Sequence, residues 1–404
     1  MVTFGSLAWA VAVLGSGVAT ELASGSQLTA RSGLMAVEAN QRSTPSMEVG
    51  VDLLSGIRAR SKRTSFDLRY HPRIYYQAPN VADRRLPLYV HQLSAGYQSS
   101  LTERTSLSLN ANATAGEVSY ASLLRSFAGG TAAQSAGIQP LFYYAATLSA
   151  SHIMSRRHSF QGGVTSGYRV ALGGEAEQSQ FPTAQDFGLH LSDQLVLSKT
   201  DSLSTVVGLS HVIQEDDLPG RLNSSNANLT ASWAHALGQQ SSVGASVGVG
   251  VNWTNRTDRV AVFPLASVNY GKVIRQVGVV WTTALRAGSD LFFDPILATF
   301  RPQALVSASL NGQHGRHANS EIGISLATSL GPPVSPAQYE TRGNLTVGGS
   351  VSNGRGISLH PGITWQLRAP HLSQPDALVL QNELYGFISL RFTVGTDHQD
   401  GSWL

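Results

Sequence analysis

Apolar and polar residues alternate along most of this chain, in segments that are separated by turns. The clearest segments are residues 242–253, 357–368 and 384–394, where nearly every second residue is apolar and those between are small or polar. A repeat of two places alternate side chains on opposite faces of an extended strand. Because the segments are long enough to cross a bilayer, they predict an all-β protein, a membrane-spanning antiparallel up-and-down β-barrel.

The predicted connections alternate between short turns and longer links. Outer-membrane barrels place short turns in the periplasm and long loops outside. The predicted short turns fall near residues 60–63, 101–104, 155–158, 198–201, 238–240, 271–273, 315–317 and 353–355. The predicted long links fall near residues 78–85, 120–137, 173–185, 214–221, 255–258, 287–296, 331–340 and 369–382. The link at 255–258 is as short as a turn and is assigned to the long links only because short and long connections alternate.

Because short and long connections alternate, a further strand is required near the start of the chain, where the apolar and polar residues alternate less clearly. Seventeen strands are delimited between Met47 and Val394, and the first connection, at 60–63, is short. The strand before a short turn runs toward the periplasm, so an earlier strand must run outward. Residues 27–40 supply it, which gives about eighteen strands and places both termini in the periplasm. Sixteen strands is the alternative count.

The first residues have the apolar run of a secretory leader. Residues 4–19 are largely apolar, and small residues follow at Ala19 and Ala23, so we expect a signal peptide at 1–23 and a single barrel domain at 27–404. The leader lacks the usual basic start, and a short buried helix or a first strand is the alternative.

Composition fits this prediction and narrows the function. Charged residues make up 13% of the chain, against roughly 25% in soluble domains. No run of eighteen apolar residues follows the leader, so transmembrane helices are not expected. Cysteine is absent, and a net charge of +3 is too small to indicate nucleic-acid binding.

Charged residues within the predicted strands fall in the polar phase. A charge that faces hydrocarbon at the bilayer centre costs about 2–4 kcal/mol. The restriction of charged residues to the polar positions therefore indicates that the apolar face of the strands contacts lipid. An eighteen-strand barrel is wide enough for an aqueous channel. We therefore expect a mildly cationic, water-filled lumen that favours anionic or polyhydroxylated solutes. The lumen-facing candidates are Glu48, Asp52, Arg58, Asp67, Arg69, His71, Arg73, Arg169, Arg368 and Arg391. The alternative for each is that the charges only pair with one another along the wall.

Two long links carry apolar residues. The link 120–137 contains Leu123, Leu124 and Phe127, which could fold into the lumen or pack outside. The link 287–296 contains Leu291, Phe292 and Phe293, which suggests burial or a partner contact.

Catalytic and metal sites are not expected. The chain has twelve histidines, but no GxSxG context surrounds a serine. His314 and His317 are spaced as two metal ligands could be, yet no carboxylate lies beside them in the predicted turn. We expect no enzyme activity, no cofactor and no metal.

From about Gln27 onward the chain resembles bacterial outer-membrane β-barrel proteins, through its alternating segments and its rhythm of short turns and long loops. Its length and lack of a periplasmic domain resemble the stand-alone barrels of polysaccharide export. This resemblance implies a Gram-negative outer membrane, lipid and lipopolysaccharide around the barrel, and a periplasmic export partner. One departure is the end of the chain: such barrels usually end on an aromatic residue, whereas this chain continues past Phe392, with Trp403 next to last. A structural or adhesive barrel with a plugged lumen and, least favoured, an outer-membrane enzyme remain as alternatives, and oligomeric state is open.

Overall fold

A computed structural model describes most of the chain. The described residues are 19–37, 42–78, 87–119, 138–172, 183–214, 223–254, 259–294, 299–330, 340–353, 357–370 and 381–395. The predicted leader up to residue 18, the link 120–137 with its apolar residues, and the tail with Trp403 lie outside them.

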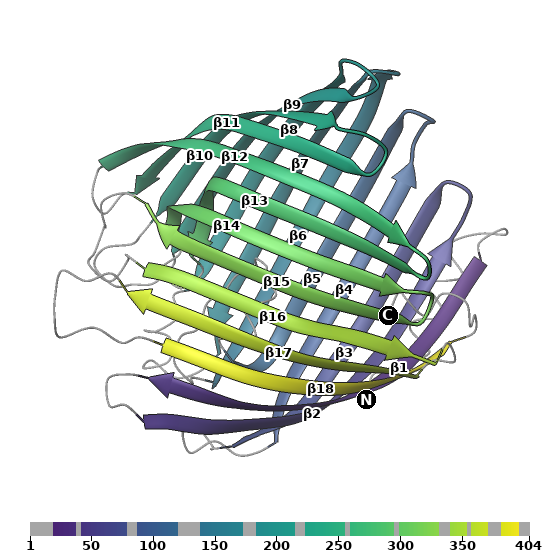
Figure 1. Cartoon of the computed structure of the whole chain (residues 1–404), viewed down its shortest axis with the longest axis vertical. Helices are drawn as coiled ribbons and strands as arrows, with labels where there is room; N and C mark the ends of the chain where they lie inside the picture. The colour runs from purple at the N-terminus through teal and green to yellow at the C-terminus, as the bar shows by residue number, and fades with distance from the viewer. Residues whose placement is uncertain are drawn as a thin grey trace.

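The described residues form eighteen β-strands (Figure 1). In chain order these are β1 (Ala19–Val37), β2 (Arg42–Arg60), β3 (Thr64–Ala78), β4 (Leu88–Ser100), β5 (Thr105–Ser119), β6 (Ile138–Ser155), β7 (His158–Ala171), β8 (Ala184–Val196), β9 (Asp201–Gln214), β10 (Ser224–Ala236), β11 (Ser241–Thr254), β12 (Arg259–Gln276), β13 (Val279–Asp294), β14 (Thr299–His314), β15 (Ala318–Ser329), β16 (Glu340–Ser352), β17 (Ile357–Pro370) and β18 (Gln381–Gly395).

Each strand pairs antiparallel with its neighbours in sequence. β1 pairs with β2 on one side and with β18 on the other, so every strand has two partners. The predicted all-β, up-and-down barrel is therefore confirmed. The strand that alternation required is β1, and it begins at Ala19, earlier than the predicted Gln27 and within the predicted leader.

The described short turns lie at one end of the barrel, on the right in Figure 1. Ala19 at the start of β1 pairs with Arg60 at the end of β2, and Gly395 at the end of β18 pairs with Ala23. The first strand therefore begins, and the last strand ends, at the end that carries the short turns. We call this the short-turn end.

Local chemistry explains why the chain reverses at these turns. A hydroxyl at the start of three turns accepts the backbone N–H three residues later, from Thr64 to Ser61 at 3.1 Å, from Thr105 to Thr102 at 3.0 Å and from Asp201 to Ser198 at 3.0 Å. Such side-chain bonds compete with continued strand pairing and favour a turn.

Two tighter turns depend on glycine. Gly278 and Gly315 have φ of 77° and 62°, values that a side chain with a Cβ adopts only with strain.

One predicted connection is wrong. Residues 287–296 were expected to form a long loop, but β13 continues to Asp294 and pairs with β14 up to Thr299. Leu291 and its apolar neighbours are therefore strand residues. The segment Gly288–Ser289–Asp290 resembles a turn in sequence, whereas in the barrel Asp290 forms an ion pair with Arg286 at 3.4 Å.

The strands have two distinct faces. Large apolar side chains are exposed on one of them, including Val247 and Val262, each 65% exposed, and Ile388, 59% exposed. Among the described residues, no helix is both long and apolar enough to span a bilayer.

Candidate functional site on the polar face

Register assigns each strand residue to one of two faces, because residues directly opposite each other in neighbouring strands share a face. Asp52 of β2 is opposite Arg73 of β3, which is opposite Val90 of β4, which is opposite Gly116 of β5. We call the face that contains Asp52 the polar face. The other, which contains Val247, is the apolar face.

A charged cluster occupies the polar face of β2 and β3. The Asp52 side chain is only 8% exposed, and its Oδ1 lies 3.2 Å from Arg73 Nε and 3.5 Å from His71 Nε2. Next along β3, Arg69 forms an ion pair with Asp67 at 3.2 Å. A buried carboxylate beside a guanidinium is stabilised by that pairing, and removal of one partner leaves the other charge costly. The pairing with Arg73 therefore stabilises the buried Asp52 carboxylate on this face.

All ten predicted lumen candidates occupy positions of the polar face by register. Arg58 is opposite Asp67, and Arg169 of β7 is opposite Tyr143 of β6. The structure brings Asp52, Asp67, Arg69, His71 and Arg73 together in the cluster, with Arg58 beside it, whereas Arg169 lies on a different part of the wall. For Glu48, Arg368 and Arg391, only the place in the register is described.

Several charged residues of the same face were missed. They are Asp186 on β8, Arg286 and Asp290 on β13, Glu321 on β15 and Arg342 on β16. Asp186 and Arg169 interact electrostatically. Most of these residues could have been identified because they occupy the polar positions of the two-residue alternation in their strands. Asp290 could not, because it was assigned to a loop.

An apolar cluster interrupts the polar face near the ends of β3, β4 and β6 that lie away from the short turns. Tyr75, Leu88, Val90 and Leu141 are buried there, with Tyr143 packed against them. The Tyr75 hydroxyl donates a hydrogen bond to the backbone carbonyl of Glu117 on β5. The guanidinium of Arg73 lies over the Tyr75 ring, 5.1 Å from its centroid, in a geometry that supports a cation–π interaction.

The polar face of β9, β10 and β11 carries no charged residue among the described positions; serine, asparagine, threonine and glycine predominate. Side chains lie flat across glycines of the next strand. A Cβ added at Gly250 would lie 2.3 Å from Cε2 of the Phe263 ring on β12. The glycine therefore lets a large side chain lie along the wall instead of projecting from it.

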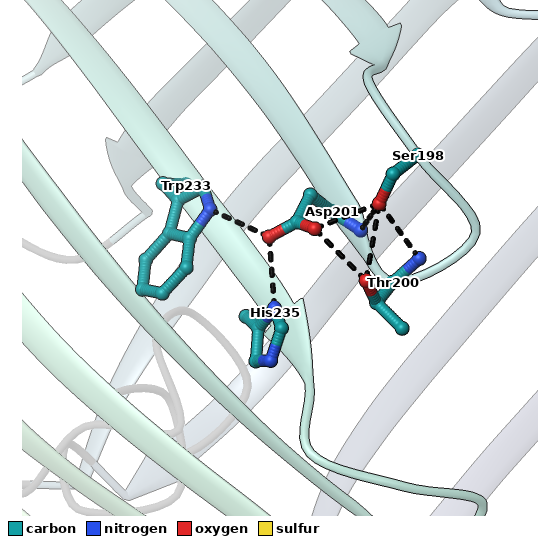
Figure 2. Close-up of polar contacts among 5 residues, drawn as sticks. All are labelled: Ser198, Thr200, Asp201, Trp233 and His235. Atoms are coloured by element: carbon teal, nitrogen blue, oxygen red, sulfur yellow. Dashed lines mark hydrogen bonds and ion pairs between the residues drawn. The ribbon is translucent and has the colours of Figure 1, made fainter.

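On the apolar face, Asp201 lies at the short-turn end, where β9 begins (Figure 2). Its Oδ2 accepts hydrogen bonds from the hydroxyls of Ser198 at 2.7 Å and Thr200 at 2.9 Å. Its Oδ1 accepts from His235 Nδ1 at 2.8 Å and Trp233 Nε1 at 3.2 Å. Asp201 is the first residue of β9 and directly follows the turn 198–200. The Ser198 hydroxyl above all, then His235 and Thr200, hold the pKa of its carboxyl well below the usual range.

Every described histidine on the apolar face has a similar cross-strand or near-turn partner. The pairs are His91 with Tyr70, His152 with Thr105, His158 with Asp193, His211 with Ser225, His235 with Asp201 and His314 with Ser320. A polar group on an apolar surface is costly unless it is hydrogen-bonded, which accounts for this pairing.

The two histidines considered as metal ligands have different surroundings. His314 bonds to Ser320 at 2.9 Å and packs edge-on against Trp281, whereas His317 lies in the turn before β15. Within the described residues, no three His, Asp or Glu side chains gather as a metal site would require.

The solved structures that resemble this chain differ from it in most of their sequence. No family model matches the chain, and no curated protein matches it by sequence. Among solved structures, OpdO of Pseudomonas aeruginosa is similar with 7% identity and a TM-score of 0.49 over 94% of this chain and 98% of that one. OccAB3 of Acinetobacter baumannii is similar with 7% identity and a TM-score of 0.47, over 93% and 99%. A copper transporter, OprC, has 10% identity and a TM-score of 0.47, over 94% and 81%. Likenesses this distant carry no argument about the function of this chain.

Proposed function

We propose that this chain is an outer-membrane channel that passes small polar solutes through a water-filled lumen. The observation that carries the proposal is the two-faced ring of eighteen strands, apolar and exposed on one face and polar on the other. A soluble protein does not expose so continuous an apolar surface, whereas a bilayer covers it at no cost.

Contacts that reach across an intervening strand support the polar face as the inner one. Tyr75 of β3 reaches β5, and Leu141 of β6 packs in the same cluster as Leu88 of β4. The wall of a barrel curves inward, so side chains of next-nearest strands approach each other on the concave side. The polar face, with its charged cluster, then lines the lumen.

The size of the ring supports a channel. Eighteen strands at a spacing of about 4.8 Å and a tilt of about 40° give a backbone diameter of about 36 Å. Arginines outnumber carboxylates on the described polar face, which favours a mildly cationic lumen. The polysaccharide-export role implied by the resemblance has no described residue that favours it.

Proteoliposome swelling tests the channel. Liposomes that contain the full chain are placed in isotonic arabinose, sucrose or a large dextran, with protein-free liposomes as the control. We expect swelling that slows as solute size rises and stops with dextran. Swelling no faster than in protein-free liposomes would contradict the proposal.

We further propose that the short turns face the periplasm. The chain has no cysteine, so a single introduced thiol reports on one position. Gly238, in the turn between β10 and β11, has open space around its Cβ position, and Leu172 is exposed at the opposite end of β7. In intact cells, a membrane-impermeant maleimide should label Leu172→Cys, and label Gly238→Cys only after the outer membrane is permeabilised. The reverse pattern would overturn the orientation.

A further inference from the structure

A concavity of about 410 Å³ lies on the wall of β13 to β16 at the short-turn end. This volume is within the range of about 300–1,000 Å³ that small-molecule sites occupy. It lies apart from the charged cluster of β2 and β3. We call it the β13–β16 concavity; the side chains that line it include Thr282, Asn311, Gln313, Asn319, Glu321 and Ser350.

Register arranges these side chains in two adjacent rows on the polar face. In one row, Thr282, Asn311 and Glu321 are opposite one another on β13, β14 and β15, and the row ends at Gly348 of β16. In the next row, Gln313, Asn319 and Ser350 are opposite one another on β14, β15 and β16. Gly348 adds no side chain to the first row, and Glu321 Oε1 lies 3.3 Å from the place where a Cβ of residue 348 would be. Six hydrogen-bonding groups thus form a patch two residues deep and four strands wide.

The hydrogen-bonding capacity of this patch is unused within the described part of the chain. Asn311, Gln313, Asn319 and Glu321 are exposed, and no described residue forms a hydrogen bond or an ion pair with their side chains. Some short side chains elsewhere on the polar face bond to each other, as Ser246 does with Ser267 at 2.7 Å. The amides and the carboxylate of the concavity are therefore available to a ligand.

The chemistry of the patch selects a polyhydroxylated ligand. A side-chain amide has two hydrogen-bond donors and an acceptor, a hydroxyl can donate and accept, and an ionised carboxylate can only accept. Sugar hydroxyls both donate and accept, so neighbouring hydroxyls on a ring match neighbouring amides on a wall. The concavity contains one carboxylate, of Glu321, and one guanidinium, of Arg316, which lies on the turn at its edge. This balance favours a neutral ligand over an anion.

We propose that the β13–β16 concavity is a binding site for neutral saccharides on the lumen wall. This proposal rests on the channel function proposed above, because the site faces that lumen. Lumen water competes for the same hydrogen bonds, so binding is weak and reversible, as passage through a channel requires. The site is close to the short turns, so a saccharide should reach it faster from that side.

Two measurements with maltose test the site on the full chain. Equilibrium dialysis of the detergent-solubilised barrel measures binding directly, and interruptions of the ionic current in a planar bilayer measure association from each side. We expect saturable maltose binding, weakened about tenfold or more in the double variant Asn311→Ala/Asn319→Ala and about three- to tenfold in Glu321→Gln. Current interruptions should be more frequent with maltose on the short-turn side.

Asn269→Ala provides a matched control. Asn269 is an exposed asparagine on the polar face of β12, outside the concavity, and its substitution should leave maltose binding unchanged. Stronger binding of gluconate than of maltose, or equal loss in Asn269→Ala, would overturn the site. A barrel that conducts but does not bind maltose refutes the site alone. A barrel that binds maltose, loses it in the double variant and never conducts supports the site and refutes the channel.

Discussion

An arginine placed on the apolar face should destabilise the barrel according to its depth. Val247 is at the middle of β11 and 65% exposed, whereas Val243 on the same face is near the short-turn end. An arginine costs about 2–4 kcal/mol at the bilayer centre and about 0–1 kcal/mol near the interface. We therefore expect Val247→Arg to lower the free energy of unfolding by about 2–4 kcal/mol, and Val243→Arg by about 1 kcal/mol or less.

Ser246→Arg is the matched control, because Ser246 is at the same depth on the opposite face. It loses the hydrogen bond to Ser267, worth about 0.5–1.5 kcal/mol, but its charge remains in water. Guanidinium titrations of barrels folded into lipid vesicles, followed by tryptophan fluorescence, measure all three variants. Equal costs at Val243 and Val247, or a larger cost at Ser246 than at Val247, would refute the assignment of the apolar face to lipid.

Three further predictions concern particular side chains. The pKa of the Asp201 carboxyl is lowered below its usual value of 3.8, so the ionised carboxylate stabilises the fold above about pH 4, and this stabilisation is lost as the pH falls toward the folded-state pKa. The difference in unfolding midpoint between wild type and Asp201→Asn should therefore shrink on acidification. A constant difference from pH 6 to pH 3 would contradict this. The double variant Arg69→Gln/Arg73→Gln should shift the reversal potential in a KCl gradient toward cation selectivity, and an unchanged potential would show that these arginines do not face the ion path. Gly250→Ala should cost about 1–3 kcal/mol through contact with the Phe263 ring, and the second change Phe263→Ala should recover part of that loss, which a double-mutant cycle in unfolding measures.

Most of the wall could be predicted from sequence because its physics is periodic. The alternation of apolar and polar residues assigns each strand residue to one of two faces. The strand before the first short turn runs toward the periplasm, so an earlier strand must run in the opposite direction. This reasoning located β1, which pairs with both β2 and β18. It also placed residues such as Asp52 and Arg73 on one face.

The prediction failed where local composition and long-range pairing disagreed. Gly288, Ser289 and Asp290 are typical turn residues, but pairing with β14 keeps them in β13, where Asp290 Oδ2 forms an ion pair with Arg286. Sequence also could not give cross-strand partners, such as the donors around Asp201. Those depend on register between segments distant in sequence, which no local pattern encodes. The β13–β16 concavity was missed for the same reason, since its rows combine residues from four strands.

The most direct test of the central claim is single-channel recording of the full chain in a planar lipid bilayer. If the apolar face contacts lipid and the polar face encloses water, additions of purified barrel should produce discrete, stable steps of conductance that scale with salt concentration. A protein that inserts into the bilayer, is protected from protease there, and yet produces no conductance would contradict the claim.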